Sequence, residues 1–358
     1  MWDTPSLGEL QKALDDPSNP IGMRMRAAYH LRHVHVKAEN EIDQSLVVEA
    51  LSKGLLDPHH GSLMRHEFAY VMGQLKDERC CETLETILQD DTDCVMVRHE
   101  AAEALGAIGA DRSKPALKAV MDRYPDRPEL SDTCRLAMNV MDWRAAGGDP
   151  ENAPAACACM LSPYSSVDPA PPHPSHVNKS DEELGDILCN DTLPIFERYR
   201  AMFSLRNRGG EGAVKELCRS LVKDESSALL RHEVAYVLGQ MQHPACVEAL
   251  EESLRRKDEH EMVRHESAEA LGAIEGRWDE VEAILTEFST DENVVVRESC
   301  CVALDAADYW GHNNSTANEG NGTNKEAMSF TQQKNEANDD ARETREPSRM
   351  LVNHFNVQ

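Results

Sequence analysis

The sequence is poor in aromatic residues and has no long apolar run. Aromatic side chains make up 5% of the 358 residues, while hydrophobic residues of all kinds make up 41%. A core built from these residues consists mainly of Ala, Leu, Val and Met. Such a core favours stacked short helices over a β-sandwich, because strands are enriched in aromatic and β-branched residues. No stretch approaches the ~20 apolar residues of a membrane-spanning helix, so we expect no membrane span.

Basic residues are scarce relative to acidic ones. The chain has 37 Lys and Arg against 64 Asp and Glu, which gives a net charge of −27 with His neutral. A nucleic-acid partner is not expected, because neutralising phosphates requires clustered Lys and Arg. The acidic excess instead favours partners that carry positive charge.

The N-terminal residues and the cysteines indicate a reducing compartment. The first ten residues, MWDTPSLGEL, lack the basic-then-apolar order of a signal peptide, so we expect a cytoplasmic protein. There, the 11 Cys residues are expected to be free thiols rather than a disulfide framework. Cys157 and Cys159 have no equivalent in the other half of the repeated chain described next.

The chain is a duplication of one half. Residues 96–108 read MVRHEAAEALGAI and return at 262–274 as MVRHESAEALGAI, with one difference in 13 positions. Residues 65–75 read RHEFAYVMGQL and return at 231–241 as RHEVAYVLGQM. Both pairs are separated by 166 residues, so the two halves correspond over their length.

A shorter period of 33 residues runs through each half. In the C-terminal half it is marked by Arg198, Arg231, Arg264 and Arg297. Each repeat contains two segments of roughly 10–14 residues whose apolar positions recur at helical spacing. A helical pair of this size cannot bury its apolar face alone and must stack on its neighbours. We therefore predict an all-α fold: an α-solenoid of eight short HEAT-like helical pairs, in two pseudo-symmetric halves that face each other.

Composition divides the chain into four parts. The N-terminal half spans 1–146 and the C-terminal half spans 181–311. Residues 147–180, rich in Pro, Ser and Gly, are predicted to be a linker between the halves. Residues 312–358 have little apolar content, and we predict a disordered tail there.

A His-Glu dipeptide occupies one register in the two middle repeats of each half. These pairs are His66-Glu67, His99-Glu100, His232-Glu233 and His265-Glu266. The outer repeats carry other residues at this register, so the helix itself does not require His-Glu there. We therefore interpret the four pairs as ligands of a bound metal ion. The Arg before each His also occurs in repeats without His-Glu, and we expect it to pack between repeats or to pair with acidic neighbours. A fifth pair, His260-Glu261, falls at a helix start and is expected on the surface.

Helix geometry supports a metal site at this register. Neighbouring stacked helices lie ~8–10 Å apart, so residues of one register on adjacent repeats can bind a common ion. Each half then offers two His and up to two Glu, and two facing halves bring two such sets across one cleft. Two His with one carboxylate is the pattern of non-haem iron(II) oxygenases. The same ligands hold catalytic zinc, so these residues leave the metal open.

The repeated motifs resemble those of the deoxyhypusine hydroxylase family. RHE-x-AY-x-x-GQ and MVRHE-x-AEALGAI each occur twice, with SVDPAPP at 166–172 and VVVRESCCVALD at 294–305, and the resemblance covers roughly residues 8–308. It implies a HEAT-repeat dyad with a di-iron centre between its halves. It further implies a monomeric monooxygenase that uses O2, two Fe ions and an unidentified electron donor. The implied substrate is the precursor of eukaryotic translation initiation factor 5A, whose deoxyhypusine side chain becomes hypusine.

The resemblance also implies roles for individual residues. The implied iron ligands are His66, His99, Glu100, His232, His265 and Glu266. Glu67 and Glu233 are the implied catalytic, substrate-contacting carboxylates, and Met96 and Met262 are implied to line the substrate pocket. Deoxyhypusine carries two amines that are cationic at neutral pH, so an acidic cleft suits it.

Two other readings remain open from the residues themselves. HEAT arrays are commonly binding scaffolds, and a fold does not dictate a function, so a non-catalytic adaptor is one alternative. A zinc-dependent hydrolase is the other, since its ligand set would be the same. Dependence on O2 and the identity of the bound metal discriminate among the three.

Overall fold

The computed structural model describes residues 5–38, 40–148, 162–164, 166–274 and 276–310. Throughout these residues the regular structure is helical, and they contain no β-strand. The predicted tail at 312–358 lies outside the described residues, as do Cys157 and Cys159 of the linker.

The described residues form sixteen α-helices. Those of the N-terminal half are α1 (Leu7–Asp15), α2 (Ile21–Lys37), α3 (Glu41–Leu56), α4 (Gly61–Leu75), α5 (Cys81–Gln89), α6 (Val95–Ile108), α7 (Lys114–Arg123) and α8 (Pro128–Ala145). Those of the C-terminal half are α9 (Asp181–Leu188), α10 (Ile195–Arg208), α11 (Gly210–Lys223), α12 (Ala228–Met241), α13 (Val247–Arg255), α14 (Glu261–Ala273), α15 (Trp278–Phe288) and α16 (Val294–Trp310). They make the eight consecutive helical pairs that the 33-residue period predicts.

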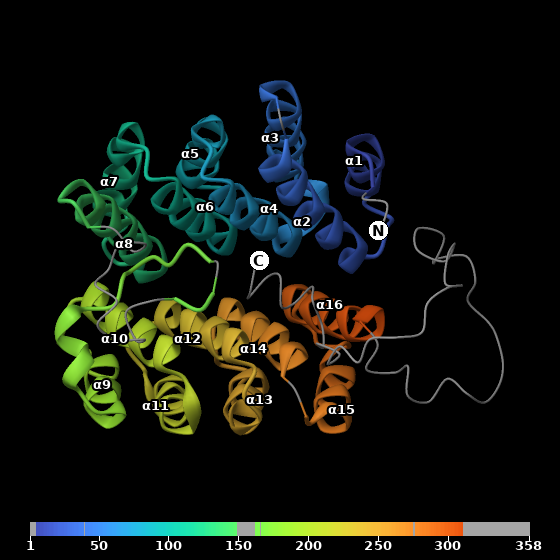
Figure 1. The fold of residues 1–358 in the computed structure, drawn as a ribbon. Helices are drawn as coiled ribbons and strands as arrows, with labels where there is room; N and C mark the ends of the chain where they lie inside the picture. Colours follow the sequence, from blue (N-terminus) through green and yellow to red (C-terminus); the bar gives the residue numbers. More distant parts are fainter. Residues whose placement is uncertain (1–4, 39, 149–161, 165, 275, 311–358) are drawn as a thin grey trace, which may run out of the picture.

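The pairs stack into two rows that face each other (Figure 1). In each row the even-numbered helices pack side by side along the inner face, and the odd-numbered helices cover their outer side. The rows meet at both ends, where α8 packs on α10 and α12, and α16 packs on α2 and α4. An ion pair between Arg26 and Asp305 joins the rows at the second of these ends. The predicted solenoid with facing halves is confirmed.

None of the helices in the described part of the chain combines the length and the apolar character that crossing a bilayer requires.

The inner helices are buried on nearly every side. In α4 and α12 almost every residue is buried, because each contacts two inner neighbours and an outer helix while its remaining side faces the other row. Glycines allow the inner helices to approach closely. A Cβ on Gly73 would lie 2.8 Å from the backbone of Ala104, and one on Gly106 would lie 2.8 Å from the backbone of Ala137.

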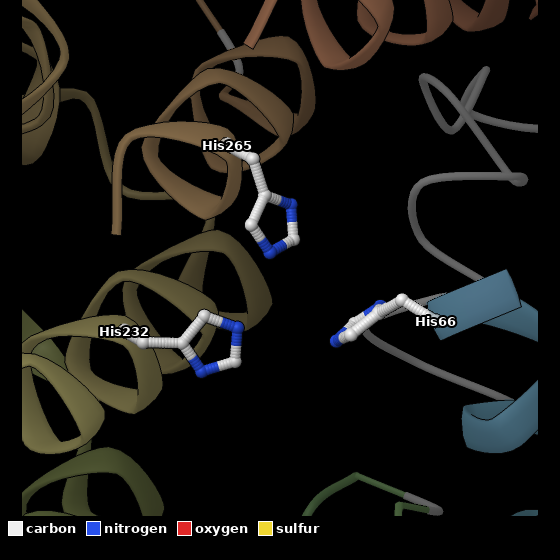
Figure 2. Close-up of side chains that lie close together, drawn as sticks. All are labelled: His66, His232 and His265. Atoms are coloured by element: carbon white, nitrogen blue, oxygen red, sulfur yellow. The ribbon is translucent and has the colours of Figure 1, made fainter. Parts of the chain in front are cut away.

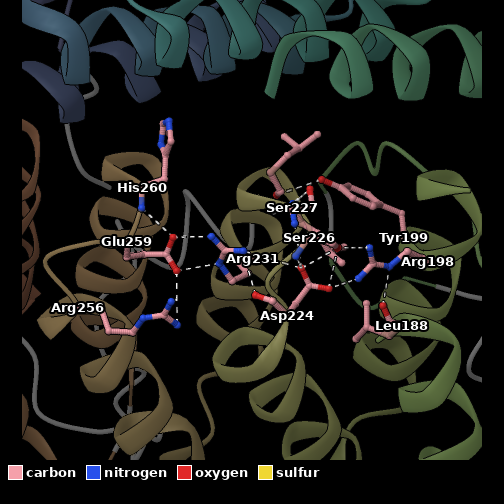
Figure 3. Close-up of polar contacts among 12 residues, drawn as sticks. Leu188, Arg198, Tyr199, Asp224, Ser226, Ser227, Arg231, Arg256, Glu259 and His260 are labelled. Atoms are coloured by element: carbon pink, nitrogen blue, oxygen red, sulfur yellow. Dashed lines mark hydrogen bonds and ion pairs between the residues drawn. The ribbon is translucent and has the colours of Figure 1, made fainter. Parts of the chain in front are cut away.

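The repeated Arg links each inner helix to its surroundings. Its Nε donates to the carbonyl ten residues earlier, at the end of the preceding outer helix, in Arg65, Arg98, Arg198 and Arg264. Such a bond satisfies one of the carbonyls that a helix C-terminus leaves unpaired. In four repeats the guanidinium also pairs with an acidic residue in the loop that precedes the next inner helix. Figure 3 shows this for Arg198 with Asp224 and for Arg231 with Glu259. The predicted role in packing and ion pairing is confirmed.

Candidate metal centre

The four predicted His residues meet at the middle of the molecule. They lie on the inner helices α4, α6, α12 and α14, and each is at most 4% exposed. Figure 2 shows His66 from one row pointing toward His232 and His265 from the other. Side chains from residues up to 199 positions apart in the chain therefore share one buried centre.

The arrangement of the rings is nearly two-fold symmetric. Within each half, the ring centroids of His66 and His99 are 5.5 Å apart and those of His232 and His265 are 5.4 Å apart. The planes of these two pairs are inclined by 39° and 38°. Between halves, His66 lies 5.2 Å from His265 and His99 lies 5.2 Å from His232. The duplication seen in the sequence is thus preserved in the geometry of the centre.

Two groups of donor atoms are close enough to hold an ion. In His66, His99 and Glu100, one donor atom from each residue lies within 4.8 Å of the others, and the same holds for His66, His232 and His265. Glu266 joins the second group through an oxygen 3.5 Å from His232 Nε2. All six residues that the resemblance implies as ligands are therefore gathered here.

Burial and nearby charges shift the pKa of His rings at the centre. Burial, and then the other His rings, lower the pKa of His99 well below its ordinary value, and burial does the same for His265. A neutral imidazole is the form that binds a metal. At His66, burial also opposes a charge, but Glu100 and Glu67 outweigh it and raise the pKa well above the ordinary value.

Several buried ring atoms need a partner. Among the described residues, both nitrogens of His99 and Nδ1 of His232 have no hydrogen-bond partner. Burying a polar atom without a hydrogen-bond partner costs free energy, and a bound metal ion would provide the missing partner. The donor set of imidazoles and carboxylates fits iron(II) and zinc alike.

Glu67 and Glu233 differ although they occupy equivalent positions. Glu67 is fully buried and accepts hydrogen bonds from the Tyr29 hydroxyl at 2.5 Å and from His66 Nδ1 at 3.1 Å. Glu233 is 3% exposed and makes no hydrogen bond or ion pair within the described part of the chain. Burial, then the neighbouring carboxyls of Glu103 and Glu100, raise the pKa of Glu233 well above its ordinary value.

A small cavity, partly open to solvent, reaches the centre. We call it the inner cavity. Its lining combines the His-Glu register, four further polar side chains of the inner helices and part of the linker. The lining residues are His66, Tyr70, Gln74, Glu100, Glu103, Ser166, Val167, Asp168, Pro169, His232, Glu233, Tyr236 and Glu266. Met96 and Met262 are fully buried at the starts of α6 and α14, and neither is among the described residues that line this cavity.

Sequence reasoning did not single out a second polar layer. It consists of Tyr70, Glu103, Tyr236 and Glu269, each four residues after one of the four His, and thus on the same helix face. Burial and the carboxyl of Glu100 raise the pKa of Glu103 to about 8. A comparison of the two halves could have revealed this layer, since these residues recur at the same 166-residue offset as the His-Glu pairs.

The linker segment 166–169 was also missed as part of the site. Its Asp168 is held by Arg206 of α10, whose Nη1 and Nη2 donate to the two carboxylate oxygens at 2.7 and 2.5 Å. Arg206 also donates to Gln240 Oε1 at 2.9 Å, and Gln240 donates to Ser166 Oγ at 2.9 Å. We call residues 166–169 the strap. A composition rich in Pro and Ser carries no sign of such anchoring.

The fifth His-Glu pair lies apart from the centre. His260 is the N-cap of α14, and its Nδ1 accepts a hydrogen bond from the backbone of Met262 at 3.2 Å. Glu261 accepts a hydrogen bond from Asn293 at 2.7 Å. Both residues are half-buried at a helix start, and neither belongs to the donor groups above.

Comparison with known proteins identifies relatives over most of the chain. A family model of HEAT repeats matches residues 48–131 and 214–305. The deoxyhypusine hydroxylase of Danio rerio is 43% identical over 288 residues, which cover 80% of this chain and 86% of the relative. That of Mus musculus is 41% identical over 303 residues, which cover 83% of this chain and 90% of the relative.

A solved structure agrees with these relatives. Human deoxyhypusine hydroxylase in complex with glycerol is 41% identical, with a TM-score of 0.72. The match covers 84% of this chain and 94% of the human chain. The similarity therefore extends over both halves and includes the segments that carry the His-Glu register.

Proposed function

The chain belongs to the deoxyhypusine hydroxylase family and hydroxylates deoxyhypusine; from this premise we propose that it does so as a di-iron, O2-dependent monooxygenase. The proposed substrate is the precursor of eukaryotic translation initiation factor 5A, a protein that carries the deoxyhypusine side chain. The observation that carries the proposal is the convergence of four buried His rings and two carboxylates beside one acidic cavity.

The proposed iron ligands divide between the two rows. They are His66, His99 and Glu100 in the N-terminal half, and His232, His265 and Glu266 in the C-terminal half. When bound, two reduced irons supply electrons for the activation of O2, and an external donor restores these electrons. His99 and His265 contribute buried imidazoles that favour the neutral form, so that metal binding displaces no proton from these two rings.

The carboxyl groups of the inner cavity hold the substrate. Glu233 faces the cavity without a partner in the described part of the chain, and an ammonium group of deoxyhypusine satisfies it. Glu67 is already bonded to Tyr29 and His66, and its charge adds to the acidic field around the site. Holding both ends of a flexible side chain positions the carbon to be hydroxylated, and such positioning is a large part of catalysis. Burial also keeps bulk water away from the centre.

Metal content and O2 dependence test the proposal directly. We expect about two irons per chain in the wild type by elemental analysis, and loss of metal in His99→Ala, since this residue belongs to a donor group. His59→Ala is the control, because this His is exposed and lies outside both donor groups. One zinc per chain with activity that persists without O2 contradicts the proposal and supports a hydrolase. Absence of metal after expression with ample iron supports a scaffold.

The division of roles between ligands and substrate contacts is tested separately. Glu233→Gln should retain the metal content of the wild type and weaken binding of the deoxyhypusine-bearing factor, whereas His99→Ala should lose metal. Glu67→Ala is expected to follow Glu233→Gln. Equal loss of metal from all three variants contradicts this division.

A further inference from the structure

Two carboxylates at the same register of the duplicated chain make different contacts. Glu103 on α6 and Glu269 on α14 are 166 residues apart, each four residues after a His of the centre. Glu269 is fully buried, accepts a hydrogen bond from Ser299 Oγ at 2.9 Å and lies 3.6 Å from His265 Nδ1. Glu103 is half-buried and makes no hydrogen bond or ion pair among the described residues.

The difference arises from the neighbouring helix. The residue that corresponds to Ser299 in the other half is Thr133 on α8. Thr133 donates its hydroxyl to the carbonyl of Glu129 in its own helix at 2.7 Å, and it is therefore not available to Glu103. The Glu103 side chain consequently faces the inner cavity, which it lines.

Glu103 lines both the inner cavity and a second, small hollow. We call this hollow the vestibule. Much of its wall is apolar, with Leu136, Ala137 and Val140 of α8 on one side and Val167 and Pro169 of the strap on the other. Glu103 and residues 167–169 line both spaces, so they form the passage between them.

The strap, which forms one wall of this passage, is held by buried side chains. Arg206, which holds Asp168, is 1% exposed and its guanidinium lies over the ring of Phe203, 4.6 Å from the centroid. Gln240 extends the network by donating to the Tyr236 hydroxyl at 3.3 Å. One wall of the passage is therefore a segment that buried hydrogen bonds and an ion pair hold in place.

We propose that the deoxyhypusine side chain enters through the vestibule, that Glu103 binds its secondary ammonium group, and that Glu233 receives the primary ammonium group at the inner end. This inference rests on the proposed function and deepens it. The order follows from the chemistry of the side chain, whose secondary amine lies nearer the protein backbone and whose primary amine is at the tip. Glu103 lines both spaces, whereas Glu233 lines the inner cavity alone.

The apolar wall and the charge at Glu103 both suit this ligand. Methylene groups of the lysine stem would lie against Leu136 and Val140 and so leave water. Burial, and then the carboxyl of Glu100, raise the pKa of Glu103, and a cation bound beside Glu103 would stabilise its ionised form.

The test is Glu103→Gln, which preserves the shape of the side chain and removes its charge. The probe is translation initiation factor 5A carrying deoxyhypusine. We expect the KM and the Kd for this protein to rise about 10-fold to 100-fold, because a charge-assisted hydrogen bond is lost. The metal content should match that of the wild type, the kcat should fall because one end of the side chain is no longer held, and Glu103→Asp should recover part of the affinity.

Matched variants separate this role from a structural one. Glu82→Gln removes the same charge from an exposed position on α5 and should leave the KM unchanged. Glu269→Gln, at the equivalent register, should leave the KM unchanged, because Glu269 bonds Ser299 and is not among the described residues that line either space. Ala107→Phe, which narrows the vestibule, should raise the KM in the same way as Glu103→Gln.

The outcomes distinguish this inference from the function on which it rests. A wild-type protein that neither binds nor hydroxylates the deoxyhypusine-bearing factor contradicts the proposed function. A wild type that does both, with Glu103→Gln indistinguishable from Glu82→Gln, overturns the role of Glu103 alone. Loss of metal in Glu103→Gln also overturns it, since the residue would then support the centre rather than bind substrate.

Discussion

Tyr70 of α4 and Tyr236 of α12 bring their hydroxyl oxygens to 3.1 Å in a hydrogen bond between the two halves. Each residue lies one helical turn beyond a His of the centre, at the same register of the duplicated sequence. Tyr236 is tied through Gln240 to the strap and to Arg206. This pair therefore connects both rows and the linker beside the inner cavity.

Removal of either hydroxyl should weaken the contact between the halves. We expect Tyr70→Phe and Tyr236→Phe each to lower the free energy of unfolding by about 1 kcal/mol, the usual net value of one hydrogen bond. The double variant should cost less than the sum, because the bond is already lost in each single variant. Urea unfolding of the four proteins measures this coupling. Strict additivity would show that the two hydroxyls do not interact.

Gly106 should be sensitive to the addition of a single methyl group. A Cβ there would lie 2.8 Å from the backbone of Ala137, so α6 and α8 would have to separate. We expect Gly106→Ala to destabilise the fold by about 1–3 kcal/mol, as overpacking does elsewhere. Gly8→Ala is the control, because a Cβ at this exposed helical position meets nothing within 4 Å. Thermal unfolding should show a lower Tm for the first variant and an equal or higher Tm for the second.

Replacement of Arg206 should lower the free energy of unfolding strongly. Its guanidinium binds both oxygens of Asp168 and also reaches Gln240, so Arg206→Met leaves a partly buried carboxylate without its partner. Breaking such a pair costs about 3–5 kcal/mol, and Lys should not rescue it because it lacks the planar fork. Arg255→Lys, in an exposed pair with Glu287, should change the unfolding free energy by less than about 1 kcal/mol. Equal effects of the two substitutions in chemical unfolding contradict the anchoring role.

His176 should make stability depend on pH. Its Nδ1 lies 2.8 Å from Ser204 Oγ, and burial, then the positive groups His173, Arg200 and Lys179, lower its pKa to about 4 from 6.5. The folded protein therefore keeps this ring neutral while the unfolded chain takes up a proton as the pH falls below 6.5. Its stabilising contribution is complete above pH 6.5 and is lost between pH 6.5 and 4.

The variant His176→Asn isolates this contribution. Between pH 7.5 and 5, metal-loaded wild type should lose about 1–2 kcal/mol more of its unfolding free energy than the variant does. Chemical unfolding at both pH values measures the difference. The same loss in both proteins would assign the pH dependence to other groups.

The duplicated sequence by itself determined the helical pairs, their number and the register of the site. Apolar spacing and the 33-residue period are local properties, and they predict which face of each helix is buried. Because His66 and His232 share one register in two matching halves, their convergence followed once the halves faced each other. The second polar layer at Tyr70 and Glu103 could have been found by the same comparison, since it recurs with the same offset.

Only the tertiary structure decided how equivalent residues differ. Glu67 and Glu233 have similar neighbours in sequence, yet Tyr29 donates a hydrogen bond to the first and a cavity lies beside the second. Ser299 donates a hydrogen bond to Glu269. Thr133, at the equivalent position, donates to the backbone of its own helix instead, so that Glu103 faces the cavity. The contacts of Tyr29 with Glu67 and of Ser299 with Glu269 join residues 38 and 30 positions apart, whereas Thr133 bonds within its own helix. A periodic pattern specifies a buried face, but the partner on that face is selected by packing between helices, and that selection differs between the two halves.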